Sequence, residues 1–199
     1  SNTTGASNSA LGHDALAANT TGGNNVAIGA FALDALTTVS SLTAVGYGAL
    51  SSNTSGTGNV AVGFSAGTAL TTGGGNTLMG SNAGDSLTSG TTSVAIGSNA
   101  LHTATTASGN TAIGYQALDV ATGANNTSIG VNSGGAVTTG TQNTCIGGLA
   151  GDSITEGSNN IMIGYQSEVN GATGSNQICI GIDINAGGDN NFSFGKASN

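Results

Sequence analysis

The stretch NTAIGYQAL, residues 110–118, returns along the chain in nearly the same form. Close copies are NVAIGAFAL from residue 25, NVAVGFSAG from 59, NTSIGVNSG from 126 and NIMIGYQSE from 160. The glycine of this phrase marks a period, and nine of its eleven steps are 17 residues, one is 16 and the last is 14. These anchor glycines are Gly12, Gly29, Gly46, Gly63, Gly80, Gly97, Gly114, Gly130, Gly147, Gly164, Gly181 and Gly195. Because this period is too short for a helix pair or a propeller blade, each unit is predicted to be one turn of a β-solenoid.

The whole chain is therefore predicted to be all-β: a parallel β-solenoid, or β-roll, of about eleven to twelve 17-residue coils. Residues 1–199 are expected to form a single array, with a partial repeat at 1–7, regular coils at 8–181 and an irregular C-terminal coil or cap at 182–199. SNTTG at 1–5 matches ANTTG at 18–22, so the sequence opens inside a repeat unit. We expect it to be a piece of a longer protein.

Each repeat contains three residues that alternate like a β-strand. The residue directly before the anchor glycine is always apolar, as in Ile28 and Ile113, and we expect this column to fill the core. The residue two before the glycine is mostly alanine and never charged, so this second face is expected to pack too, against the other half of the coil or another chain. The candidate trimer seam is this alanine column: Ala27, Ala44, Ala61, Ala95 and Ala112.

The second half of each repeat predicts a thin core and regular turns. Four residues past the anchor glycine stands either a leucine, such as Leu118, or a glycine followed three residues later by a large apolar residue, as in Gly151 and Ile154. Each coil thus supplies about one large apolar side chain, here called the plug, to a thin core. Asparagines four residues before the anchor glycine, such as Asn110, predict a structural ladder of stacked turns. A threonine column forms a candidate exposed ladder: Thr20, Thr37, Thr54, Thr71, Thr88, Thr105, Thr122, Thr138 and Thr155.

Composition excludes several classes of function. The chain has one lysine or arginine against nine acids, and its net charge of −8 argues against a nucleic-acid partner, since such binding relies on basic side chains. No run of 18 apolar residues and no signal peptide occur, so no membrane insertion is predicted.

The residues that bear chemistry do not gather into a predicted active site. His13 and His102 lie five repeats apart in different columns, which disfavours a shared metal or catalytic site. Cys145 and Cys179 share a column two coils apart, about 9.6 Å, beyond the ~7 Å limit for a disulfide, and are predicted to be buried thiols.

Four acids stand five residues past an anchor glycine: Asp34, Asp85, Asp119 and Asp152. They are interpreted as solvated charges that keep the rod soluble. Calcium binding is the more specific alternative. The calcium-roll nonapeptide is absent, however, and no cofactor is predicted. No catalytic carboxylate pair, nucleophile elbow, phosphate loop or HExxH motif occurs, so an enzyme is not predicted.

NTAIGYQAL, followed by TTG or NTTG and a new copy of the phrase, resembles the repeat of phage tail-fibre and related bacterial surface proteins that carry an endosialidase-type C-terminal chaperone. More loosely, it is similar to the left-handed parallel β-roll heads of trimeric autotransporter adhesins. The resemblance covers essentially residues 8–195. It implies a side-by-side homotrimer of parallel rolls and a cleavable chaperone after the fibre. A single wide solenoid is the alternative.

Three functions follow from these observations. The first is a structural and adhesive fibre segment, a phage tail-fibre shaft or a bacterial adhesin, located on a virion or outside the cell and presenting a surface for a cell-surface glycan or another host receptor. The second is ice binding by the threonine ladder. The third is a self-assembling extracellular filament subunit that stacks end to end.

Overall fold

The computed structural model describes residues 2–196, which form twelve short strands and no helix. All twelve strands pair in parallel and in chain order in one sheet, so the fold is a parallel β-solenoid. The strands are β1 Ser9–Leu11, β2 Val26–Ile28, β3 Thr43–Val45, β4 Val60–Val62, β5 Thr77–Met79, β6 Val94–Ile96, β7 Thr111–Ile113, β8 Thr127–Ile129, β9 Thr144–Ile146, β10 Ile161–Ile163, β11 Ile178–Ile182 and β12 Phe192–Lys196. The predicted fold class is confirmed.

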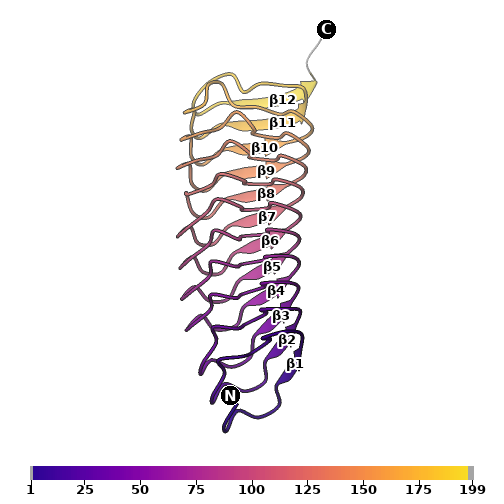
Figure 1. The fold of residues 1–199 in the computed structure, drawn as a ribbon. Helices are drawn as coiled ribbons and strands as arrows, with labels where there is room; N and C mark the ends of the chain where they lie inside the picture. The colour runs from indigo at the N-terminus through magenta and orange to yellow at the C-terminus, as the bar shows by residue number, and fades with distance from the viewer. Residues whose placement is uncertain (1, 197–199) are drawn as a thin grey trace.

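The coils stack into a rod with the two ends of the chain at opposite ends of the stack (Figure 1). Eleven steps of about 4.8 Å give a length of roughly 50 Å. Neighbouring strands pair without a shift of register, so each residue lies above its counterpart in the repeat, as Ala95 does on Ala112. Even the 14-residue step keeps this register, since Ile178 pairs with Phe192. Every sequence column therefore becomes a straight line of side chains along the rod.

The anchor glycines are required by the stacking of the coils. Gly97 has a φ of +134°, and a Cβ atom placed on it would lie 2.5 Å from the carbonyl oxygen of Gly114 in the next coil. Nearly the same geometry recurs at Gly114, whose added Cβ would lie 2.3 Å from the carbonyl oxygen of Gly130. Only glycine fits this combination of backbone conformation and close approach. The conformation explains why the period is marked by glycine.

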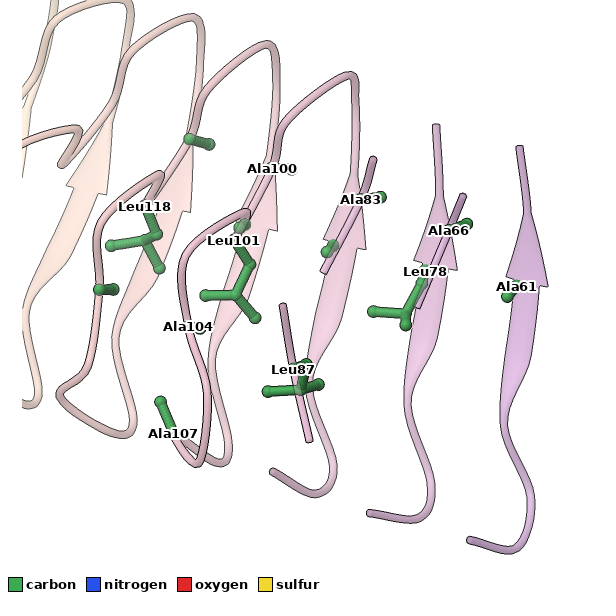
Figure 2. Close-up of a cluster of buried hydrophobic side chains, with 14 of the residues drawn as sticks. Ala61, Ala66, Leu78, Ala83, Leu87, Ala100, Leu101, Ala104, Ala107 and Leu118 are labelled. Carbon is green, nitrogen blue, oxygen red and sulfur yellow. The ribbon is translucent and has the colours of Figure 1, made fainter. Parts of the chain in front are cut away.

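The interior of each coil is filled by the residue two before the anchor glycine, here called the inner column. From the second coil to the eleventh this column is completely buried. Its members are Ala27, Ala44, Ala61, Leu78, Ala95, Ala112, Ser128, Cys145, Met162 and Cys179. Figure 2 shows Ala61 and Leu78 lining the interior together with the plugs Leu87, Leu101 and Leu118. The predicted plugs are buried, which confirms the prediction of one large apolar plug in most coils.

Two predictions about the strand faces are wrong. The residue directly before the anchor glycine does not fill the core: Ile28 and Met79 are 40% exposed and Ile96 is 36% exposed. The alanines predicted as a trimer seam, Ala27, Ala44, Ala61, Ala95 and Ala112, lie inside a single chain. The physical reason is space, because a coil that already holds one large plug has room for only a small side chain from the strand.

The size of the inner-column residue is matched to the size of the residue that faces it across the core. Where this column carries Leu78, Ser128 or Cys145, the residue facing it across the core is a glycine four residues past an anchor glycine. A Cβ atom on Gly67 would lie 2.6 Å from Leu78 Cδ1, and one on Gly151 would lie 2.6 Å from Cys145 Sγ. The choice between leucine and glycine four residues past the anchor is therefore matched to the strand on the opposite wall.

Asparagines hold the turns between coils together. Asn143 is buried, its Nδ2 donates to the carbonyl oxygen of Gly157 at 2.9 Å, and its backbone N–H donates to Asn126 Oδ1 at 3.0 Å. The same pattern links Asn126 to Asn110, where the coil is one residue shorter. Buried amides that are fully hydrogen-bonded stabilise the stack, so the structural interpretation of these asparagines is confirmed.

Candidate functional site

The sheet presents a long apolar face to solvent. We call it the outer sheet face, and it consists of the residues three and one before each anchor glycine, such as Val94 and Ile96 in β6. Residues of this face are half-buried or exposed in every coil, and they are valines, isoleucines, threonines, phenylalanines, one leucine, one methionine and one serine. Parallel sheets are normally covered on both faces. An uncovered apolar face that runs the length of the rod is a candidate interaction surface.

The threonine ladder lies on the turns rather than on the sheet. None of its nine predicted members is buried, and Thr37, Thr54, Thr105 and Thr122 are exposed. Their hydroxyl groups are engaged by the stack: Thr88 Oγ1 donates to the carbonyl oxygen of Thr105 at 3.0 Å, and Thr138 Oγ1 donates to that of Thr155 at 3.0 Å. The regularity of this column therefore has a structural cause, the hydrogen bond from each coil to the next.

The residues five past each anchor glycine form the acid column, in which the structure places a histidine between two aspartates. His102 Nε2 lies 3.5 Å from Asp85 Oδ1, and His102 Nδ1 lies 3.3 Å from Asp119 Oδ1. All three side chains are partly exposed. Burial raises the pKa of Asp85, while the neighbouring His102 lowers it. The imidazole thus bridges carboxylates two coils apart.

This bridge is not predicted in the sequence analysis, because His102 is paired there with His13 and not with the aspartates. His102 is five residues past Gly97, as Asp85 is past Gly80 and Asp119 is past Gly114. That shared spacing was the available signal. His13 lies in the first coil of the rod, where its Nδ1 is 3.2 Å from Asp14 Oδ2.

Further along the acid column, a hollow of about 300 Å³ opens between Asp119 and Asp152. The coil between them contributes Gly135 to the column and so has no side chain there. The hollow is lined by Gln116, Asp119, Asn132, Gly135, Ala136, Leu149 and Asp152. Carboxylates, amides and one leucine therefore meet around a single depression.

A second carboxyl group lies beside Asp152. Glu168 accepts hydrogen bonds from the backbone N–H of Asp152 at 3.0 Å and from the Ser153 hydroxyl at 2.5 Å. Burial, together with the carboxyl group of Asp152, raises the pKa of Glu168 to about 7. This carboxyl group therefore changes its protonation state near neutral pH.

Aromatic side chains form an exposed stack on the first four coils. The ring centroids of His13 and Phe31 are 5.4 Å apart, those of Phe31 and Tyr47 5.6 Å, and those of Tyr47 and Phe64 5.4 Å. The first two pairs meet edge to face and the last pair is stacked. Tyr47 and Phe64 are exposed.

The cysteines are free thiols in the interior. Cys145 and Cys179 are buried and not joined by a disulfide, as predicted. Burial raises the pKa of the Cys145 thiol to about 12, so it stays protonated and unreactive at neutral pH.

Within residues 2–196, no three histidine, cysteine, aspartate or glutamate side chains are grouped so that they would bind a metal ion. That part of the chain also has no helix with the length and apolar character needed to cross a membrane.

Comparisons with protein-family models, with curated proteins and with solved structures found no match. The function is therefore inferred from the geometry and from the repeat.

Proposed function

We propose that the chain is a non-enzymatic structural and adhesive fibre segment that associates with copies of itself through the outer sheet face. The observation that carries this proposal is the uncovered apolar face along the whole rod, of which Ile96 and Ile129 are members. Hiding such a face from water stabilises an assembly by about 25 cal/mol for each Å² of apolar surface.

A second copy of this chain is the partner that fits best. A partner must match a face that repeats at every coil, about every 4.8 Å, over roughly 50 Å. Another copy has the same repeat, and its face has the same small number of charges. Closed rotational symmetry would let identical faces cover one another without leaving a free one. A homotrimer is the assembly that the resemblance to phage tail fibres and trimeric adhesins implies.

In such a fibre the side chains on the turns face outward. Among them are the acid column with its hollow and the aromatic stack around Tyr47. We place the protein on a virion or outside a cell, where these surfaces would meet a cell-surface glycan or another host receptor. The earlier candidate for the seam, the alanine column, is replaced by the outer sheet face.

The test is the oligomeric state of the purified chain, measured by light scattering and native mass spectrometry. We expect a trimer, and we expect Ile96→Arg to yield a folded monomer because it places like charges in the contact. Ser89→Arg adds the same charge on an exposed turn and should leave the trimer intact. A wild-type monomer at micromolar concentration would reject the proposal.

The two other functions make different predictions. Open-ended filaments would appear in native mass spectra as a continuous series of masses. Ice binding predicts thermal hysteresis that is lost when ladder threonines are replaced. The structure offers it little support, because the hydroxyl groups of threonines such as Thr88 and Thr138 donate to the neighbouring coil.

A further inference from the structure

The acid column contains the same arrangement of two carboxylates twice, once occupied and once open. Between Asp85 and Asp119 the intervening coil carries His102, whose two ring nitrogens lie 3.5 and 3.3 Å from the carboxylates. Between Asp119 and Asp152 the intervening coil carries Gly135, and the hollow of about 300 Å³ occupies the corresponding place.

The backbone does not require glycine at position 135. Its φ is outside the left-handed region, and an added Cβ atom would lie 3.2 Å from the carbonyl oxygen of Asn132, a tight contact rather than a clash. The preceding Gly134 differs, since its φ is +57° and an added Cβ atom would lie 2.6 Å from Ser128 Oγ. The hollow thus exists because a side chain is missing where one would fit.

We propose that this hollow binds a planar organic cation, a guanidinium or imidazolium group supplied by a ligand. His102 shows within the same molecule what fits between carboxylates two coils apart: a flat ring whose two nitrogens lie close to the two carboxylates. Asp119 and Asp152 would accept charge-assisted hydrogen bonds, which are about twice as strong as neutral ones. The amides of Gln116 and Asn132 would add polar contacts, and the apolar stem of the ligand would pack on Leu149 and Ala136.

The composition of the chain agrees with an external source for this cation. The sequence has one lysine or arginine in 199 residues and a net charge of −8. The resulting field attracts cations to the rod. The residues around the hollow lie on turns and none belongs to the outer sheet face, so this inference does not rest on the proposed trimer.

The first experiment titrates the full chain at pH 7.5 with N-acetyl-arginine amide while backbone amide NMR signals are recorded. We expect saturable shifts at Gly135, Ala136 and Asn132. N-acetyl-citrulline amide has nearly the same shape without the charge, and we expect it to bind about tenfold more weakly. Equal binding of the two compounds, or shifts spread along the whole acid column, would overturn the proposal.

Substitutions then test the site itself. Asp152→Asn should weaken binding of the arginine compound about tenfold, because one of the two carboxylates is lost. Asp34→Asn is the matched control in a distant part of the same column, and it should change nothing. Gly135→His should fill the hollow as His102 fills its own place and should abolish binding, with circular dichroism verifying the fold.

The reciprocal variant is the sharpest test. His102→Gly should open a second hollow between Asp85 and Asp119, so that the compound also shifts the amide of Thr103 and two sites titrate instead of one. If His102→Gly remains folded yet gains no site, the correspondence between the two arrangements is wrong. If Asp152→Asn also binds like the wild type, no part of the proposal survives.

Discussion

Ala95 and Ile96 are adjacent in β6, yet they have opposite surroundings. Ala95 is completely buried inside its coil, whereas Ile96 is 36% exposed on the outer sheet face. The smaller, less hydrophobic residue is inside and the larger one outside, contrary to the usual preference for burying large aliphatic side chains. The difference teaches that the width of a 17-residue coil, rather than hydrophobicity, decides which residue fits inside.

The same substitution at these two positions should give the largest contrast. Ala95→Arg places an unpaired charge in the interior, and we expect a loss of more than about 4 kcal/mol or failure to fold. Ile96→Arg should change the stability of the isolated chain by less than about 1 kcal/mol, because its charge reaches water. Chemical denaturation, at a protein concentration low enough to dissociate the assembly, measures both values. Similar losses would mean that the two faces are assigned wrongly.

A glycine pair extends the comparison to the backbone. Gly97→Ala combines a φ of +134° with a Cβ atom 2.5 Å from the carbonyl oxygen of Gly114, and we expect a loss of about 3 kcal/mol. Gly148→Ala is the control, since it has no left-handed φ and its Cβ atom would lie 3.5 Å from Tyr165 Cδ2. We expect this change to be neutral or to stabilise by about 0.5 kcal/mol. Thermal unfolding of both variants distinguishes a stacking role from a general effect of losing glycine.

At Glu168 a carboxyl group occupies a position that is leucine or glycine in the nine preceding coils. Its pKa of about 7 in the folded chain exceeds the ordinary value of 4.5, so the folded state binds more protons between these values. Stability should therefore fall as pH rises from about 4.5 to 7, in total by roughly 1–2 kcal/mol after solvent screening, and then level off.

Denaturation curves measured across this pH range provide the check. Glu168→Gln should remove the decrease in stability, whereas Glu156→Gln, at an exposed carboxyl group, should retain it. A rise in stability over the same interval would contradict the raised pKa.

The smallest effect is expected at the threonine ladder. Thr88→Val removes the hydrogen bond from Thr88 Oγ1 to the carbonyl oxygen of Thr105 and should cost about 1 kcal/mol. Thr72 is exposed and directly follows the ladder residue Thr71. Thr72→Val should change the free energy of unfolding by less than about 0.5 kcal/mol. Equal values from equilibrium denaturation would show that the ladder bond contributes nothing measurable.

Much of the fold was predictable because it is periodic. The 17-residue spacing of the anchor glycines, the apolar alternation before them and the plug compensation determined a parallel stack of short strands. The buried cysteines and the structural asparagines, such as Asn143, followed from their columns. The candidate site was predicted less well: the acid column was recognised, but neither the histidine bridge at His102 nor the hollow at Gly135 was.

The sequence by itself determined the period, the register and the columns of this protein, because a repeat in sequence becomes a repeat in space when coils stack in parallel. Only the tertiary structure decided which side of each strand faces inward. Alternation separates the faces but does not orient them. Orientation depends on the space that the plug leaves on the opposite wall, where Leu101 leaves room for Ala95 and none for Ile96. The tertiary structure likewise decided that a missing side chain at Gly135 opens a hollow, since a gap in a column becomes a site only between the side chains stacked on either side.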